Sequence, residues 1–280
     1  EGFVMEFVYL GTAAAEGWPA LFCSCNACLQ AREKGGRNVR GRSQALVDGE
    51  LLLDLPADTF SRTLEGRLDL TAVRHCLITH SHSDHLYPAD LEMRRTGFAH
   101  PADSRPFVLY GTKTAGREIR SVLKKYGLEQ DGRVHFQPIR PFEPFPAGRH
   151  TVTALPADHD PASGPVIYIV SDGEKTLLYA HDTGYFPEES WEYLERKRPF
   201  FHFVSLDCTC GPLECRRGHM GLSAACETYD RLQQLGCVSG STIAYVNHFS
   251  HNGGKIYDEL LPLAAAEGFQ VSYDGLCLTL

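Results

Sequence analysis

The chain has 280 residues, 43% of them hydrophobic, and carries a formal net charge of −8 at pH 7 with neutral histidine. This length and apolar content suffice for a substantial core, whereas the negative charge and the lack of a long basic stretch argue against a surface for extended nucleic acid. The sequence has no apolar run of about 18 residues and no basic-then-apolar start, so we expect neither a membrane span nor a signal peptide. Its ten cysteines partly follow Cys-x-Cys spacing, which is typical of metal binding rather than of a disulfide scaffold, so a cytoplasmic location is expected.

Short apolar runs and helical periodicities alternate along the chain and predict a layered α/β structure in one domain, residues 1–280. Residues 1–4, which precede Met5, are interpreted as a remnant of expression. Residues 140–148 contain three prolines and predict a loop. We expect strands near residues 6–10, 45–54, 73–79, 107–110, 151–155, 166–171, 176–180, 202–206, 242–247 and 270–280, and helices near residues 114–126, 188–197, 223–235 and 255–267.

Two local patterns refine this outline. Residues 32–43 hold five basic side chains against one acid, together with three glycines. They predict a mobile, solvated connector, with a cover over a phosphate-bearing substrate as the alternative. Ser223 stands at the start of a helical periodicity and is a candidate N-cap.

The run from Thr79 to His85 concentrates more metal-binding chemistry than any other part of the chain. It places three imidazoles and a carboxylate in six positions directly after an apolar run, residues 76–78. His80 and His82 are two apart and point the same way from a strand end, whereas Asp84 and His85 turn toward a neighbouring site. One motif can therefore begin two metal sites. A histidine-rich surface turn is the alternative, but ordinary turns have a different composition.

This His-x-His-x-Asp-His pattern after a buried strand resembles the signature of the metallo-β-lactamase superfamily, and the resemblance extends from about residue 5 to residue 280. It implies a four-layer αββα sandwich. It also implies two divalent ions, manganese or zinc with iron as a further option, and a bridging hydroxide that attacks the substrate. The resemblance implies that one ion is bound by His80, His82 and His159, that the other is bound by Asp84, His85 and His248, and that Asp182 bridges them. It also counts Asp84 as catalytic. Asp54 is implied as the catalytic-site carboxylate that orients a metal-bound histidine.

Three cysteines lie within six residues, at positions 23, 25 and 28. Three thiolates at this spacing suit a tetrahedral structural zinc that lacks one ligand. The placement is similar to the superfamily branch that contains the cyclic-phosphate phosphodiesterase of phosphonate breakdown and the pyrroloquinoline-quinone biosynthesis protein. That resemblance implies His251, three residues after His248, as the fourth ligand. A disulfide or idle buried thiols are the alternatives for Cys23, Cys25 and Cys28.

The same branch implies a further catalytic histidine, and the matching stretch of this chain contains His219. We expect it to protonate a leaving oxygen or to donate a hydrogen bond to a phosphoryl oxygen. Arg216 and Arg217 either add positive charge for a phosphate or are solvated surface arginines. Tyr185 is a candidate substrate contact.

A second cysteine-rich segment has no counterpart in that resemblance. Cys208, Cys210 and Cys215 permit a further zinc or a redox pair by spacing alone, and free thiols are the default interpretation. Asp207 ends an apolar run beside them and either orients a neighbouring group or caps a turn.

These patterns lead us to expect a metal-dependent hydrolase, most simply a phosphodiesterase that acts on a small cyclic phosphodiester of a ribose or nucleoside. A lactone or thioester hydrolase with the same two-metal site is the alternative enzyme. A metal-binding biosynthetic protein without turnover is the alternative of another class. The expected partner is a small anionic substrate, without extended nucleic acid or membrane, and family resemblance suggests a homodimer.

Overall fold

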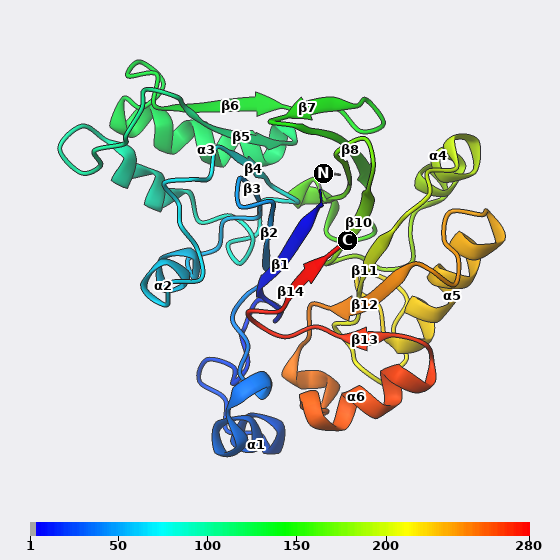
Figure 1. The fold of residues 1–280 in the computed structure, drawn as a ribbon. Helices are drawn as coiled ribbons and strands as arrows, with labels where there is room; N and C mark the ends of the chain where they lie inside the picture. Colours follow the sequence, from blue (N-terminus) through cyan, green and yellow to red (C-terminus); the bar gives the residue numbers. More distant parts are fainter. Residues whose placement is uncertain (1–3) are drawn as a thin grey trace.

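The computed structural model describes residues 4–280. An expression remnant was expected at residues 1–4, and residues 1–3 of that stretch lie outside the described residues. Two mixed β-sheets form its centre (Figure 1). The first sheet has the strand order β14-β1-β2-β3-β4-β5-β6, with β14 Cys277–Thr279, β1 Glu6–Gly11, β2 Gln44–Val47, β3 Leu51–Leu53, β4 His75–Leu77, β5 Phe107–Gly111 and β6 Val134–Pro138. The second has the order β13-β12-β11-β10-β9-β8-β7, with β13 Gln270–Val271, β12 Ile243–Asn247, β11 Phe203–Asp207, β10 Thr176–Ala180, β9 Val166–Ser171, β8 His150–Pro156 and β7 Phe145–Ala147.

Alternation of side chains along the strands divides the core into layers. In β1, Phe7 and Tyr9 pack between the two sheets, whereas Leu10 packs on the outer face of the first sheet. In β10, Tyr179 faces the first sheet and Leu178 joins the core on the outer face of the second. Because successive strand residues point to opposite faces, each sheet buries one face against its partner sheet and the other against helices.

Helices cover both outer faces, as Figure 1 shows for α3 beside the first sheet and for α4, α5 and α6 beside the second. The four-layer αββα sandwich expected from the sequence is thereby confirmed. The α-helices are α1 Asn26–Lys34, α2 Thr59–Leu64, α3 Lys113–Tyr126, α4 Glu188–Lys197, α5 Leu222–Gln234 and α6 Tyr257–Ala266, and short 3₁₀ turns lie at η1 Gly36–Asn38, η2 Pro88–Arg94, η3 Pro161–Ser163 and η4 His251–Gly253.

Several local predictions differ from the structure. The single strand expected at residues 45–54 is a hairpin of β2 and β3, and the loop expected at residues 140–148 contains β7. Helices α1 and α2 and strand β6 have no predicted counterpart. Ser223 is not an N-cap, because α5 begins at Leu222 and the preceding Gly221 makes no side-chain cap.

The prediction of a mobile, solvated connector at residues 32–43 is wrong. Helix α1 runs through its first part, and Arg40 is only 3% exposed. The Arg40 guanidinium donates to Thr12 Oγ1 at 2.8 Å and to the Ser272 carbonyl at 2.7 Å, and it lies over the Phe249 ring. Three buried partners therefore fix this segment to the body of the protein, which its basic composition did not reveal.

Parallel pairing brings the carboxyl ends of several strands to one end of the sandwich. Strands β3 and β4 are parallel in the first sheet, and β10, β11 and β12 are parallel in the second. The loops that follow these strands therefore meet at a common edge, where ligands bind in open α/β sheets. In residues 4–280, we find no helix with the length and apolarity needed to cross a bilayer.

Candidate metal centre

The residues predicted as metal ligands come from the loops that follow four strands. The run from His80 to His85 follows β4, and His159 follows β8. Asp182 follows β10, and His248 comes directly after β12. These segments are distant in sequence, and the convergence of the strand ends brings their side chains into two groups, each with ligand atoms within 4.8 Å of one another.

The first group joins three imidazoles and one carboxylate, from His80, His82, His159 and Asp182. His82 Nδ1 lies 3.1 Å from His80 Nε2 and 3.2 Å from His159 Nε2. Asp182 Oδ2 lies 3.1 Å from His80 Nε2 and 3.4 Å from His159 Nε2. Two neutral imidazole nitrogens can form a hydrogen bond only if one carries a proton and the other a lone pair. One divalent cation would instead bind a lone pair of every ring nitrogen in the group.

The second group contains Asp84, His85, Asp182 and His248, all of them buried. His85 Nε2 lies 3.2 Å from His248 Nε2, 3.2 Å from Asp84 Oδ2 and 3.3 Å from Asp182 Oδ2. Burial lowers the pKa of His248 to about 3. A neutral imidazole beside carboxylates is the state that binds a divalent ion.

Asp182 belongs to both groups and is 3% exposed. Its Oδ2 atom faces ring nitrogens of each group, and its Oδ1 atom is buried 2.9 Å from His219 Nδ1 without a well-directed hydrogen bond. Burial acts to raise the pKa of this carboxyl, but the surrounding imidazoles hold it well below its ordinary value. A buried carboxylate oxygen that lacks a hydrogen-bond partner fits a bridging position between two cations.

Asp54 lies behind the second group and orients His85. Its Oδ2 atom is 2.7 Å from His85 Nδ1, and its Oδ1 atom accepts hydrogen bonds from the Thr79 amide at 2.8 Å and hydroxyl at 2.9 Å. Burial lowers the pKa of His85, but the charges of Asp54 and Asp84 raise it well above its ordinary value. The Asp54 contact directs the other ring nitrogen of His85 toward the centre of the site, as outer-shell carboxylates do for metal-bound histidines.

A second buried carboxylate, Asp207 at the end of β11, orders the other side of the site. It accepts hydrogen bonds from the Asp182 amide at 2.8 Å, from the Met220 amide at 2.8 Å and from the Thr209 hydroxyl at 2.9 Å. Thr209 Oγ1 in turn lies 2.8 Å from His248 Nδ1. Of the two roles open from the sequence, Asp207 performs both, since it caps its own turn and positions ligand segments. Burial raises its pKa to about 6.

Three residues of the site adopt left-handed backbone conformations although none is glycine. Asp54, Asp182 and His248 have φ values of 67°, 54° and 66°. Each stands just beyond a strand, where the turn redirects its side chain toward the centre. Such conformations cost free energy and concentrate at functional sites.

A cavity of about 420 Å³ opens onto both groups. His82, Asp84, His159, Asp182 and His248 line it from the ligand sets, together with His219. The remaining lining comes from Ala14, Ala15, Glu16, Thr209, Cys210, Leu213, Ser250, Asn252 and Gly253.

His219 stands at the wall of this cavity, where the sequence predicted a catalytic histidine. Burial lowers its pKa, but contact with Asp182 and the charge of Asp207 raise it to about 9. His219 also forms a group with Asp182, Asp207 and His248 in which one ligand atom of each residue lies within 4.8 Å of the others. The geometry therefore suits either a proton donor beside the centre or an additional ligand.

Asp158 fastens the loop that carries His219 to the loop that carries His159. Its carboxylate accepts a two-pronged bond from Arg217 at 2.8 and 2.9 Å and a bond from the Gly218 amide at 3.0 Å. The Gly218 carbonyl lies 3.0 Å from His159 Nδ1. Arg217 is thus paired with Asp158 rather than directed at a substrate.

The other two residues considered near this loop also have protein partners. The Arg216 guanidinium pairs with Glu227 and lies 3.8 Å from the centre of the Tyr185 ring. Tyr185 is absent from the lining of the cavity described above. Neither a phosphate contact of Arg216 nor a substrate contact of Tyr185 is thus supported by the geometry.

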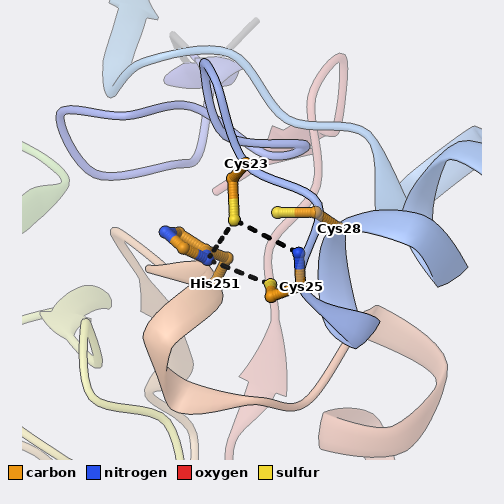
Figure 2. Close-up of side chains that lie close together, drawn as sticks. All are labelled: Cys23, Cys25, Cys28 and His251. Carbon is orange, nitrogen blue, oxygen red and sulfur yellow. Dashed lines mark hydrogen bonds between the residues drawn. The ribbon is translucent and has the colours of Figure 1, made fainter.

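The cysteines of the N-terminal segment meet His251, as Figure 2 shows. Cys23 Sγ and Cys25 Sγ lie 3.6 and 3.3 Å from His251 Nδ1, and Cys28 Sγ completes a group whose ligand atoms lie within 4.8 Å of one another. These cysteines form no disulfide. The Cys25 and Ala20 amides donate to Cys23 Sγ and Cys28 Sγ.

The electrostatics of this cluster suit a metal. Hydrogen bonding to His251 and to the Cys28 backbone lowers the pKa of Cys25 to about 6, whereas burial raises that of Cys28 to about 11. The Cys₃His donor set is a tetrahedral zinc set. Such an ion would join the N-terminal segment to η4, three residues beyond His248.

The second cysteine-rich segment shows no comparable group within residues 4–280. Cys208 is buried, Cys210 lines the cavity, and Cys215 Sγ contacts the His219 carbonyl at 3.3 Å. All three are free thiols, which is the default expected from the sequence. Sequence reasoning did not find Glu16, Thr209 or Ser250 as cavity residues, because single polar residues in loops carry no pattern.

Comparisons with known proteins agree with this architecture. Residues 52–246 match the family described as Beta-lactamase superfamily domain. Coenzyme PQQ synthesis protein B of Methylobacterium radiotolerans is 29% identical over 168 residues, which cover 54% of this chain and 52% of that protein. The chain thus spans about half the length of the curated relative that it matches.

Solved structures match almost the whole chain. A diphosphatase from the PhnP family has a TM-score of 0.75 at 20% identity, covering 99% of this chain and 98% of that one. Zinc-bound PqqB from Methylobacterium extorquens has a TM-score of 0.72 at 21% identity, covering 98% and 100%. YhfI from Bacillus subtilis, a metallo-β-lactamase fold protein, has a TM-score of 0.70 at 17% identity, covering 99% and 100%. Since the family match covers more than half of the chain and the αββα sandwich is its fold, this protein belongs to the beta-lactamase superfamily.

Proposed function

We propose that this protein is a metal-dependent phosphodiesterase that acts on small cyclic phosphodiesters of a ribose or nucleoside. One observation carries the proposal: two four-residue ligand groups share Asp182 at the wall of one cavity of about 420 Å³. Ligand pockets for small molecules begin at a few hundred Å³, so a compact substrate suits this cavity.

The ligand assignment follows from the two groups. His80, His82 and His159 would hold one ion, Asp84, His85 and His248 the other, and Asp182 both. When bound, such a pair of ions, with manganese, zinc or iron all compatible with these donors, supplies an activated water and stabilises charge on phosphoryl oxygens. Asp54 and Asp207 keep the ligand segments in place, so little reorganisation accompanies the reaction.

His219 is the proposed proton donor for the leaving oxygen. Its Nδ1 atom faces Asp182, and Nε2 has no partner among the described residues. The ring lies on the cavity wall beside Asp182, which is the position that a general acid requires. The likeness to a diphosphatase from the PhnP family supports phosphorus chemistry at this site.

A second candidate function rests on the likeness to the coenzyme PQQ synthesis protein and to PqqB. In that case the protein would bind metal in a biosynthetic role without hydrolytic turnover. The shared carboxylate and the adjoining His219 favour the hydrolase, since a protein that only binds metal has no need of a proton donor beside the ions.

The deciding experiment measures phosphodiester hydrolysis by manganese-reconstituted protein, with bis(p-nitrophenyl) phosphate and a ribose cyclic phosphate as substrates. Asp84→Ala should reduce turnover at least about 100-fold, because it removes a ligand of one group. Elemental analysis should show less metal in this variant. Absence of turnover in fully metallated protein would contradict the phosphodiesterase and favour first a lactone or thioester hydrolase and then the biosynthetic role.

A further inference from the structure

Glu16 is a charged residue of the cavity that belongs to neither active-site ligand group. It lies in the loop between β1 and α1, which is attached beside the metal centre by a hydrogen bond from the Ala14 amide to the Phe249 carbonyl at 2.9 Å. Phe249 directly follows the candidate ligand His248. The position of Glu16 is therefore fixed relative to the candidate metal centre.

The two carboxylate oxygens of Glu16 differ in their surroundings. Ser250 donates its hydroxyl to Oε1, and His251 Nε2 lies 3.6 Å from the same atom. Oε2 has no hydrogen-bond partner among the described residues, and the side chain is 28% exposed. One oxygen thus anchors the group while the other remains available to a ligand.

The charged groups of the cavity wall indicate which ligand groups Glu16 Oε2 can bind. Three carboxylates line the cavity among the described residues: Asp84 and Asp182, which belong to the ligand groups, and Glu16, which does not. Neutral polar side chains from Thr209 and Ser250 make up other parts of the wall. A carboxylate accepts hydrogen bonds but cannot donate them, and it repels a second anionic group at that end of a ligand.

Resting on the proposed function, we propose that Glu16 determines which phosphodiesters this protein accepts. Its Oε2 atom accepts a hydrogen bond from a hydroxyl group on the part of the substrate away from the phosphorus. The substrate class is therefore a cyclic phosphodiester whose remainder is an uncharged, hydroxyl-bearing sugar, and a second phosphate on that sugar is disfavoured.

The test compares wild-type protein with Glu16→Gln, which keeps the shape and an oxygen for Ser250 but removes the charge. Three probes are used: ribose 1,2-cyclic phosphate, the same compound with a phosphate on its 5-hydroxyl, and bis(p-nitrophenyl) phosphate, which has no hydroxyl. Wild-type kcat/KM should favour the first probe over the second. The substitution should reduce that preference about tenfold, because charge-assisted hydrogen bonds are roughly twice as strong as neutral ones.

A binding measurement supplies a readout independent of turnover. Calorimetric titration with ribose 1-phosphate and ribose 1,5-bisphosphate should show wild-type protein binding the former more tightly and Glu16→Gln losing the difference. Glu214→Gln is the matched control, since it removes the same charge from an exposed residue next to the cavity-lining Leu213. It should leave both selectivities unchanged.

Two further measurements keep the outcome interpretable. Because Glu16 also contacts His251, zinc content is determined for every variant, and Glu16→Asp serves as a second variant that retains the charge. Equal selectivity in wild type and Glu16→Gln, or a wild-type preference for the doubly phosphorylated probe, would overturn the role of Glu16. Failure of wild-type protein to hydrolyse bis(p-nitrophenyl) phosphate would instead count against the proposed function.

Discussion

Asp182 has the most demanding position of any single residue in this site. It is buried, accepts no well-directed hydrogen bond at Oδ1, and faces imidazole nitrogens from both ligand groups at Oδ2. An isolated buried charge would be costly, and the surrounding histidines and candidate cations offset that cost. Asp207 and Thr209 contribute no ligand atom to the two groups that share Asp182, but they hold its backbone and the His248 ring in position.

His219 provides the sharpest test at the level of one side chain. His219→Ala should lower kcat about 100-fold for a ribose cyclic phosphate, whose alkoxide leaving group requires a proton. The loss should be far smaller for bis(p-nitrophenyl) phosphate, because nitrophenolate leaves without protonation. Steady-state kinetics on both substrates, with elemental analysis of the variant, measures this difference. Equal losses on both substrates together with lost metal would identify His219 as a ligand instead.

Residue types that form a pattern were predictable from the sequence. The seven candidate ligands stand in a recognisable order after apolar runs. Asp54 was expected to orient a histidine, and its Oδ2 atom lies 2.7 Å from His85 Nδ1. Glu16 and Asp158 were not predicted. Each is one acidic residue in a loop, and its importance arises only when the fold brings distant segments together.

Among the secondary-structure elements, the hairpin of β2 and β3 has a structural role beyond its length. Asp48 in its turn accepts a hydrogen bond from the Glu6 amide at 2.7 Å, and its Oδ2 atom lies 2.6 Å from His150 Nε2 and 2.6 Å from the Arg149 guanidinium. Glu6 belongs to the first sheet, whereas His150 begins β8 of the second. One turn carboxylate therefore links the two sheets.

Asp48→Asn should lower the free energy of unfolding by about 1.5 to 3 kcal/mol at pH 7, the range for hydrogen bonds to charged groups. Burial acts to raise the pKa of Asp48, but His150 and Arg149 lower it below its ordinary value. A lowered folded-state pKa stabilises the protein above the unfolded value of about 3.9, and this contribution is lost as the pH falls through the folded-state pKa.

Urea denaturation at a series of pH values measures the effect. The difference between wild type and Asp48→Asn should be largest at neutral pH and shrink below about pH 4, where the wild-type carboxyl also becomes protonated. Asparagine tolerates the left-handed backbone of residue 48, whose φ is 53°, so the change isolates the charge. Asp131→Asn in an exposed turn is the control. A difference that does not vary with pH would contradict the argument.

Elements with strong apolar runs were also predictable, and those defined by tertiary contacts were not. The long helices α3 and α5 have clear periodicity, and their existence follows from the sequence. Helix α1 has little amphipathic character, and α2 is only six residues long. Contacts such as those of Arg40 hold the segment after α1 in place. Such contacts join residues that are distant in sequence, so no local sequence pattern predicts them.

At the scale of the whole molecule, the cysteine cluster joins segments from opposite ends of the chain. Cys25→Ser should remove one zinc per chain, as measured by elemental analysis, and lower the midpoint of thermal unfolding by at least about 5 °C, since a structural ion contributes directly to folding stability. Cys277→Ser, at an exposed cysteine outside the cluster, should do neither. Unchanged zinc content in Cys25→Ser would remove the cluster from consideration as a zinc site.

The left-handed conformations of Asp54, Asp182 and His248 imply a trade-off between durability and activity. Each left-handed conformation costs about 1 to 3 kcal/mol. Glycine would relieve that cost at any of the three positions, but it would also remove the side chain that belongs to the metal centre. A search for more heat-resistant variants of the metal-free protein should therefore return glycine at residue 182, whose Oδ1 atom lacks a well-directed hydrogen bond, and not at residue 54, whose carboxylate satisfies the buried Thr79 and His85 donors. Such variants would outlast the natural chain on heating and fail as catalysts.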